Sequence, residues 1–261
     1  MELGLNGKSA VVTGASRGIG AATVLGLAAE GVKVACCSRN VAEFKELSEQ
    51  GSELSGSIHP FEADLTDPEQ LEEFMKGAEA AVGAPDILVN GVGASPSRNF
   101  LYMTDEEWLE GFNVNLMTAV RCTRRVIGGM RKKKWGRIIM VSSGAAKSPS
   151  APLIDYSAAK AGMLSVAKSL ARKYGSDQIL VNSVLPGLIR TDMWERTAAE
   201  IADSTGATID GVFEERGARV PLGRFGTSGE VADLIVYLAS DRAAYVNGAA
   251  IDIDGGLQAG I

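Results

Sequence analysis

The sequence predicts a single α/β domain in which a parallel, doubly wound sheet carries helices on both faces. Three observations support this fold class: short apolar runs alternate with longer helical patterns along the 261 residues, the runs are rich in Val and Ile without strict polar alternation, and no repeat or linker-like segment interrupts them. Strands buried on both faces have such continuous apolar runs. We therefore expect one domain over residues 1–261, with a central sheet of about seven strands.

The expected elements follow one another in order. Strands are predicted at residues 9–13, 32–37, 87–90, 137–142, 179–185 and 249–253, with a further strand before Asp64. Helices are predicted at residues 18–30, 40–50, 67–82, 105–132, 156–174 and 228–240. Thr66-Asp67-Pro68 and Thr104-Asp105-Glu106-Glu107 are typical helix starts, because a capping side chain precedes acidic residues.

Residues 191–225 fit the alternation less well. They separate two predicted elements and contain helical patches with Gly206, Gly211 and Gly217. An insertion of this length in a compact domain usually has a function. We expect it to form a substrate lid over the active site.

Composition argues against several classes of function. The chain has 46% hydrophobic and 22% charged residues, an ordinary globular balance, and its net charge of -6 opposes nucleic-acid or anionic-membrane partners. No signal-peptide pattern or membrane-spanning apolar stretch is present, so a cytoplasmic location is expected. Cys36, Cys37 and Cys122 lack metal-ligand spacing and are expected to be buried thiols of a reducing compartment.

The chain has a single histidine, His59. Unless His59 takes part, this excludes the Ser-His-Asp and Cys-His nucleophile schemes, and it argues against a zinc site. We expect no metal, and a general acid or base must come from Tyr, Lys, Asp or Glu.

A glycine-rich turn directly follows the first predicted strand. After Thr13, the sequence Gly-Ala-Ser-Arg-Gly-Ile-Gly places glycines at 14, 18 and 20. A helix that begins near Gly18 would direct its free N–H groups and the positive end of its dipole at a phosphate. The spacing is GxxxGxG rather than GxGxxG, and such turns also occur for packing reasons. Its place after the first strand favours a pyrophosphate-binding site.

The residues after the second strand indicate which cofactor is bound. An acidic residue at this point commonly binds the ribose 2′-OH of NAD, but Cys36-Cys37-Ser38-Arg39-Asn40 contains none. Arg39 and Arg17 could pair with a 2′-phosphate from two sides, although exposed loop arginines are also common. NADP(H) is predicted, with NAD(H) as the alternative. Asp64-Leu65 is expected to contact the adenine, and a helix-cap role for this region stays open.

A Tyr–Lys pair lies on a predicted helix that begins with the sequence Asp155-Tyr156-Ser157-Ala158-Ala159-Lys160. Residues four apart share one helix face. A phenol with a pKa near 10 is a poor base at neutral pH, and lowering that pKa by ~3 units requires ~4 kcal/mol. A nearby ammonium and an oxidised nicotinamide ring would both stabilise the phenolate. Tyr156 is therefore a candidate for proton transfer.

The order and spacing of these motifs resemble those of the short-chain dehydrogenase/reductase family. The resemblance covers essentially the whole chain. The motifs are residues 13–20, Asn90-Gly91-Val92-Gly93, Asn115, Ser142-Ser143, Tyr156-xxx-Lys160, Pro186-Gly187, Pro221-Leu222-Gly223-Arg224 and Asp252-Ile253-Asp254-Gly255-Gly256. The resemblance implies a Rossmann fold and an enzyme that interconverts a carbonyl and a secondary alcohol with NADP(H), most like 3-oxoacyl-[acyl-carrier-protein] reductases. An NAD-dependent alcohol, polyol/sugar or steroid dehydrogenase, or a non-catalytic cofactor-binding regulator, are the alternatives.

The resemblance also assigns four catalytic residues. Ser143 matches the family's serine better than Ser142 and would hold the substrate oxygen beside the Tyr156 phenol. Lys160 would bind the nicotinamide ribose and lower the pKa of Tyr156. Asn115 would anchor a water that relays protons to the lysine.

The expected cofactor contacts follow the same motifs. They are Gly14, Ser16, Arg17, Gly18, Ile19, Gly20, Ser38, Arg39, Asn40, Asp64, Leu65, Asn90, Gly91, Tyr156, Lys160, Pro186, Gly187, Ile189 and Thr191. The usual family sequence at positions 90–93 is Asn-Asn-Ala-Gly, so Gly91 and Val92 depart from it. The backbone of Ile189 and the hydroxyl of Thr191 would meet the carboxamide and fix the ring face that delivers hydride.

The substrate and the assembly are less closely defined. Met193 and Trp194 could line a partly apolar pocket at the entrance of the substrate site. Packing in the core explains such residues equally well. Lys147 could meet an anionic substrate or be solvated. The resemblance implies a homotetramer, formed through the helices at 105–132 and 156–174.

Overall fold

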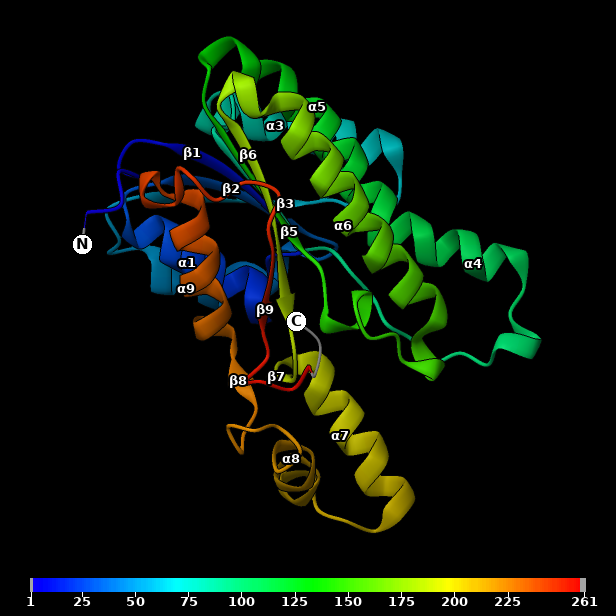
Figure 1. Ribbon diagram of the computed structural model, residues 1–261. Coiled ribbons are helices and arrows are strands. Elements are labelled where there is room, and N and C mark those ends of the chain that lie inside the picture. Colours follow the sequence, from blue (N-terminus) through cyan, green and yellow to red (C-terminus); the bar gives the residue numbers. More distant parts are fainter. Residues whose placement is uncertain (1, 259–261) are drawn as a thin grey trace.

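The computed structural model describes residues 2–258 and confirms the predicted fold class (Figure 1). Seven parallel strands form one sheet in the order β3-β2-β1-β4-β5-β6-β9. Their bounds are β1 Ser9–Thr13, β2 Lys33–Ser38, β3 Ser57–Glu62, β4 Ile87–Asn90, β5 Gly136–Val141, β6 Ile179–Pro186 and β9 Ala250–Ile253. Two strands have the predicted bounds, the other listed predictions differ by one residue at one or both ends, and β3 is the strand expected before Asp64.

Helices cover both faces of the sheet (Figure 1). One face carries α1 Gly18–Ala29, α9 Ser228–Ala239, the 3-10 turn η1 Val41–Phe44 and α2 Lys45–Gly51. The other face carries α3 Pro68–Val82, α5 Thr118–Lys133 and α6 Ile154–Tyr174. Successive strand residues point into opposite cores, as Val12 and Val11 do. The apolar runs of the sequence are thus explained by burial on both sides.

Helices α1 and α9 pack along each other although they lie at opposite ends of the chain. Leu27 of α1 and Ile235 of α9 belong to one buried cluster. Gly26 lies so close to α9 that a Cβ on it would be 3.0 Å from the Val236 side chain. The first and last helices of the domain therefore share one apolar interface.

Both predicted helix starts are confirmed. The Asp67 side chain accepts hydrogen bonds from the backbone of Glu69 and Gln70 at the start of α3. Thr104 and Glu107 form a reciprocal capping box at the start of α4 (Asp105–Phe112). These caps satisfy backbone N–H groups in the first turns of α3 and α4.

The long helix predicted at 105–132 is not continuous. After α4, residues Asn113–Met117 form a π-helical turn, and α5 begins at Thr118. Such a turn places one extra residue in the helix and is frequent at functional sites. Asn115 lies in its middle, so the irregular turn positions a residue predicted to be catalytic.

Residues 191–225 form a unit that projects beyond the sheet (Figure 1). It consists of α7 Asp192–Thr205 and α8 Ile209–Gly217, whose cluster includes Phe213 and Phe225. The short strands β7 Ile189–Arg190 and β8 Gly226–Thr227 pair in parallel at its base. The segment is thus ordered and has its own small core, and its function as a lid stays a prediction.

No helix within residues 2–258 has the length and apolar character needed to cross a membrane.

Candidate active site

The candidate site lies where the strand order reverses. The chain lays β2 and β3 on one side of β1 and then β4, β5 and β6 on the other, so β1 and β4 are neighbours at the reversal. In open parallel sheets, ligands bind outside the carboxyl ends of the strands at this point. The segments after Thr13, Asn90 and Val141, where three strands end, therefore share one edge.

The glycine turn after β1 has the geometry of an anion-binding turn. Gly14 has φ +66° and Gly18 has φ +56°, in the left-handed region that favours glycine. Helix α1 begins at Gly18, no side chain caps it, and its first turn contains no acidic residue. The N–H groups at the start of α1 are thus available to an anionic group, which fits the predicted pyrophosphate.

Gly20 allows close packing within this turn. A Cβ on Gly20 would lie 2.2 Å from the Gly14 carbonyl oxygen and 2.8 Å from the Ala15 Cα. Both atoms belong to the backbone and cannot rotate away. The glycine at this position is therefore required by the start of α1 itself.

We expect Gly20→Ala to weaken NADPH and NADH binding alike by about tenfold, because the added methyl displaces the phosphate-binding turn, and to cost about 1–3 kcal/mol of unfolding free energy. The measurement is a fluorescence titration with each cofactor. Gly128→Ala is the control: it lies in α5, a Cβ there meets nothing within 4 Å, and alanine favours the helix. Unchanged cofactor affinity in Gly20→Ala would contradict this assignment of the turn.

Gly91, which departs from the usual family sequence, lies in close contact with Thr13. A Cβ on Gly91 would lie 2.6 Å from the Thr13 carbonyl oxygen. The Gly91 N–H donates a 3.1 Å hydrogen bond to the Thr13 hydroxyl. Glycine here lets the loop after β4 lie directly against the end of β1 and the glycine turn.

Asn90 holds the centre of the sheet rather than facing the loop. Its amide donates to the Thr123 hydroxyl and to the Met140 sulfur, both at 3.3 Å. Its carbonyl oxygen is buried and has no hydrogen-bond partner among residues 2–258. These contacts agree with a sheet-stabilising role.

The segment predicted to select the 2′-phosphate lies beside the glycine turn. The Ala15 N–H donates to the Cys37 carbonyl at 3.1 Å, which ties the turn to the end of β2. Ser38, Arg39 and Asn40 follow, and Arg39 is exposed. The two arginines predicted for the 2′-phosphate thus come from adjacent segments.

A carboxylate that the sequence analysis did not expect also lies there. Glu43 in η1 accepts a 2.6 Å hydrogen bond from the Ser16 hydroxyl. Its other oxygen lies 3.7 Å from Arg17 Nη2, and Asp192 lies 3.7 Å from Arg17 Nη1. No acidic residue ends β2, but one reaches the same place from the following turn.

The side chains of Asp64 and Leu65, predicted to contact the adenine, are engaged in contacts within the protein. The Asp64 carboxylate accepts hydrogen bonds from the backbone N–H and the hydroxyl of Thr66, at 2.9 and 2.7 Å. The Leu65 side chain is buried in the core. The cap of the following helix is Asp67, so neither residue has that role, and the adenine contact stays a prediction.

Three of the four residues predicted to be catalytic meet at the end of β5. Lys160 Nζ donates a 2.8 Å hydrogen bond to the Val141 carbonyl and lies 5.7 Å from the centre of the Tyr156 ring. The Ser143 side chain lies near enough to the Tyr156 phenol to lower its pKa. Ser142 is buried and donates to the Lys160 carbonyl at 3.1 Å, so it attaches α6 to β5. This division agrees with the choice of Ser143 over Ser142.

Burial shifts the pKa values of both Tyr156 and Lys160. Burial raises the pKa of the Tyr156 phenol, and the Ser143 side chain partly opposes this. Burial lowers the pKa of Lys160 to about 8. Tyr156 is therefore protonated at neutral pH, as a general acid must be. The lowering of its pKa by Lys160 and an oxidised nicotinamide stays a prediction for the cofactor-bound enzyme.

The buried Lys160 gives a pH-dependent contribution to stability. Because its pKa is about 8 in the folded protein against an ordinary 10.5, the unfolded chain binds the additional proton between these pH values. The free energy of unfolding therefore rises with pH across this window, by up to about 3 kcal/mol. Urea unfolding should show wild type gaining on Lys160→Met from about pH 8 to about pH 10. An equal gain over the exposed Lys173→Met would contradict the assignment to Lys160.

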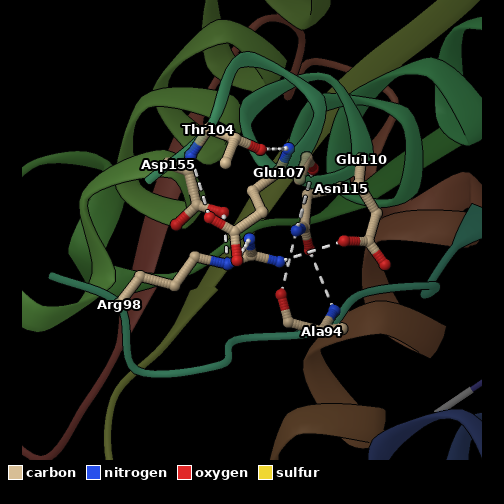
Figure 2. A network of polar contacts seen from close by, with 8 residues as sticks. Ala94, Arg98, Thr104, Glu107, Glu110, Asn115 and Asp155 are labelled. Carbon is tan, nitrogen blue, oxygen red and sulfur yellow. Dashed lines mark hydrogen bonds and ion pairs between the residues drawn. The ribbon is translucent and has the colours of Figure 1, made fainter. Parts of the chain in front are cut away.

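Asn115 fastens the loop that follows β4. Its amide donates to the Ala94 carbonyl at 2.9 Å and to the Gly111 carbonyl at 3.1 Å, and its oxygen accepts from the Ala94 N–H at 3.0 Å (Figure 2). A Cβ on Gly93 would be 3.0 Å from this oxygen and 3.3 Å from Lys160 Nζ. Asn115 therefore lies close to the lysine, and its side chain clamps Ala94, which the sequence analysis missed.

Arg98 is a second anchor of the same loop, also missed from the sequence. Its guanidinium lies 3.1 Å from Glu107, 3.1 Å from Glu110 and 3.5 Å from Asp155 (Figure 2). Its side chain is 13% exposed and that of Asp155 only 1%. The only signal in the sequence is the position of Asp155, directly before Tyr156.

These two anchors hold the loop that follows β4. Ala94 is fixed by Asn115 and Arg98 by α4 and α6, and the Arg98 N–H donates to the Pro152 carbonyl at 2.9 Å. A Cβ on Gly111 would be 2.4 Å from the Asp155 carboxylate, so glycine admits that side chain against α4. Residues 95–97 lie between the anchors, and the Ser95 hydroxyl reaches the Met193 sulfur.

The segment predicted to line the nicotinamide also reaches the glycine turn. A Cβ on Gly18 would lie 3.4 Å from Thr191 Cγ2, so Thr191 is adjacent to the start of α1. A Cβ on Gly187 would be 2.6 Å from that of Asp254, which explains the glycine after Pro186. Ile189 is buried in β7, so only its backbone can face a ligand.

The three residues considered for the entrance of the substrate site differ in their contacts and exposure. Trp194 packs edge-on against Phe225 at 5.1 Å, inside the cluster of residues 191–225. Met193 is 48% exposed, and the Ser95 hydroxyl donates to its sulfur at 3.2 Å. Lys147 pairs with Asp252 at 2.6 Å while its side chain stays 40% exposed, and a contact of this lysine with an anionic substrate stays a prediction.

The cysteines are free and buried, and burial raises the pKa of both Cys36 and Cys122 to about 12. Within residues 2–258, no group of three or more His, Cys, Asp or Glu side chains is arranged to hold a metal ion.

The sequence is similar to that of known reductases over almost its whole length. Residues 14–258 match a family model described as enoyl-(acyl carrier protein) reductase. The chain is 36% identical over 255 residues to 3-oxoacyl-[acyl-carrier-protein] reductase FabG of Escherichia coli, and 38% identical over 259 residues to that of Vibrio harveyi. Each alignment covers 98% of this chain and 99% of the relative.

Solved structures agree over the same length. L-sorbose reductase from Gluconobacter frateurii, in complex with NADPH and L-sorbose, superposes with a TM-score of 0.96, 32% identity and 100% of both chains covered. A variant of actinorhodin polyketide ketoreductase with NADPH gives a TM-score of 0.90 and 30% identity, over 96% of this chain and 97% of the other.

Proposed function

This chain belongs to the short-chain dehydrogenase/reductase family, whose members are NAD(P)-dependent oxidoreductases of CH–OH and C=O groups, and we propose that it reduces a ketone or 3-oxoacyl thioester with NADPH. The observation that carries this proposal is the assembly of a protonated Tyr156 with Ser143 and Lys160 at the end of β5. This assembly lies at the reversal of strand order, beside the glycine turn.

The residues around the glycine turn fit NADPH. The uncapped start of α1 suits the pyrophosphate, Arg17 and Arg39 suit the 2′-phosphate, and Lys160 suits the nicotinamide ribose. Two structures similar to this chain contain NADPH. When bound, NADPH supplies the hydride that the reduction requires.

The protein's own residues supply the proton and the orientation. Tyr156 donates its phenolic proton to the substrate oxygen, and Ser143 holds that oxygen beside the phenol. The Lys160 ammonium, fixed by the Val141 carbonyl, stabilises the phenolate that remains. We propose that Asn115, whose side chain holds the loop after β4, also anchors the water that returns the proton.

The substrate class follows from similarity and from the mouth of the site. The FabG relatives favour a 3-oxoacyl thioester, and L-sorbose reductase favours a polyhydroxy ketone. Met193 offers an exposed apolar surface opposite Ser95, whereas Lys147 is engaged with Asp252. We therefore propose an acyl chain rather than an anionic group near residues 188–194, with residues 191–225 closing over it as a lid.

One observation favours a second function, that of an NAD-dependent alcohol, polyol/sugar or steroid dehydrogenase working oxidatively. Glu43 brings a carboxylate to the Ser16 hydroxyl. Acidic residues near this place commonly bind the ribose 2′-OH of NAD. The two functions differ in cofactor and direction.

The test is a fluorescence titration of the purified protein with NADPH and, in parallel, NADH. We expect NADPH to bind about tenfold more tightly or better, and Arg39→Ala to remove most of this difference. Arg172→Ala, at an exposed arginine of α6, is the matched control. Equal or tighter NADH binding would reject NADPH reduction, and alcohols, polyols and steroids would then be screened for oxidation. With NADPH preferred, ketones and 3-oxoacyl thioesters are screened by the loss of NADPH absorbance.

We also propose a homotetramer in the cytoplasm. Phe100, Leu101, Tyr102 and Leu109 are exposed apolar side chains on η2 (Phe100–Tyr102) and α4, beside the helices expected at the interface. The buried free thiols agree with a reducing compartment. A monomeric mass in sedimentation would reject the tetramer.

A further inference from the structure

We propose that Glu43 sets the cofactor selectivity of this enzyme: its carboxylate occupies the Ser16 and Arg17 side of the 2′-phosphate site and weakens the binding of 2′-phosphorylated cofactor. The inference rests on the proposed function, because it concerns the same cofactor site. It assigns a role to a residue that lies outside the glycine motif and outside the end of β2.

The contacts of Glu43 are those that a phosphate would make. One carboxylate oxygen accepts a 2.6 Å hydrogen bond from the Ser16 hydroxyl, and the other lies 3.7 Å from Arg17 Nη2. Ser16 and Arg17 precede Gly18, the first residue of α1. The protein therefore presents its own anion to the hydroxyl donor and the guanidinium that were predicted to bind a cofactor phosphate.

The arginine is further neutralised from its other side. Arg17 Nη1 lies 3.7 Å from the Asp192 carboxylate, at the start of α7. Arg39 is exposed and has no ion pair among the residues that the structure describes. Of the two arginines, only Arg39 thus has an uncompensated charge within residues 2–258.

Glu43 is placed on an element that keeps it there. The 3-10 turn η1 begins at Val41 and is capped by the Asn40 side chain, which accepts from the Ala42 N–H. The Val41 N–H donates to Glu62 at 3.2 Å. Two links thus fix the backbone of the turn, while the Glu43 side chain is 34% exposed and can rotate away when an anion arrives.

A 2′-phosphate and a 2′-hydroxyl respond to this carboxylate in opposite ways. The phosphate carries close to two negative charges, so it must either displace Glu43 from Ser16 or lie beside a like charge, and both reduce its affinity. A ribose hydroxyl is neutral and can donate to the carboxylate. Glu43 therefore narrows the preference for NADPH over NADH that the arginines create.

The experiment measures binding rather than turnover. Isothermal titration calorimetry compares adenosine 2′,5′-bisphosphate with adenosine 5′-monophosphate on wild type, Glu43→Gln and Glu46→Gln, and NADPH with NADH on the same proteins. Glu46→Gln is the matched control, because it removes the same charge from the next turn, where Glu46 contacts Gln50. We expect Glu43→Gln to bind the bisphosphate about tenfold more tightly and the monophosphate within about twofold of wild type, with Glu46→Gln unchanged for both.

Two results would overturn the inference. Bisphosphate affinity that stays within about twofold in Glu43→Gln would mean that Glu43 moves aside without cost. Lost monophosphate affinity with unchanged bisphosphate affinity would instead make Glu43 a ligand of the ribose hydroxyl. If wild type binds neither NADPH nor NADH, the proposed function fails and the inference with it. If wild type binds NADPH and Glu43→Gln changes nothing, the inference alone fails.

Discussion

Replacing Tyr156 by Phe lowers kcat for ketone reduction by about 10³-fold in our expectation, while the affinity for NADPH changes by about twofold or less. The substitution keeps the ring near Lys160 and removes only the phenolic hydroxyl, whose pKa the Ser143 side chain lowers. Proton transfer by a positioned acid contributes about 10²–10⁴-fold to such reactions. Steady-state reduction followed by NADPH absorbance, with cofactor affinity from fluorescence, separates the two effects.

Tyr174→Phe is the matched control for this experiment. It makes the same chemical change on the same helix, at the last residue of α6, where the ring packs beside Arg131. Its kcat should equal that of wild type. A loss smaller than about tenfold in Tyr156→Phe would show that another group donates the proton, and an equal loss in Tyr174→Phe would point to a general structural effect.

Arg98→Met is expected to lower the free energy of unfolding by about 3 kcal/mol, because it leaves the Asp155 carboxylate buried without its cation. Asp155 is 1% exposed, and neither of its oxygens has a hydrogen-bond partner within residues 2–258. Glu107 and Glu110 are far more exposed, so their pairs with Arg98 contribute little. Thermal unfolding should show a decrease of about 6–12 °C in Tm.

A second substitution separates charge from packing. Asp155→Asn, introduced into Arg98→Met, removes the uncompensated charge and should restore at least half of the lost stability. Glu110→Gln, at a side chain that is 71% exposed, should cost about 0.5 kcal/mol or less. Equal losses in Arg98→Met and Glu110→Gln, or no recovery in the double variant, would contradict the buried-pair explanation.

The fold was predictable because burial leaves a strong mark on the sequence. A parallel sheet covered on both faces requires continuous apolar strands, and these gave most strand bounds to within a residue. Because all strands run in the same direction, the motifs after β1, β4 and β5 meet at one edge. The grouping of Ser143, Tyr156 and Lys160 was predicted from the resemblance to the family, and the shared edge of the sheet is the physical reason that these motifs meet.

The contacts that were missed join residues whose proximity no local pattern records. Glu43 is an ordinary exposed residue of a turn by sequence, and only the fold brings it to Ser16. Arg98 and Asp155 lie far apart along the chain, and each alone is compatible with a solvated surface. The π-helical turn at Asn113–Met117 was missed because one extra residue in a long amphipathic stretch barely alters its periodicity.

The pairing of α1 with α9 has a consequence for synthesis on the ribosome. Helix α1 emerges early, but the partner for its apolar face, Ser228–Ala239, is made roughly 200 residues later, about 10–40 s at usual elongation rates. During that interval Val24 and Leu27 lack their cover, and β6 still lacks β9 on its outer edge. Nascent or C-terminally truncated chains should therefore be prone to aggregation and depend on chaperones until the last helix is released.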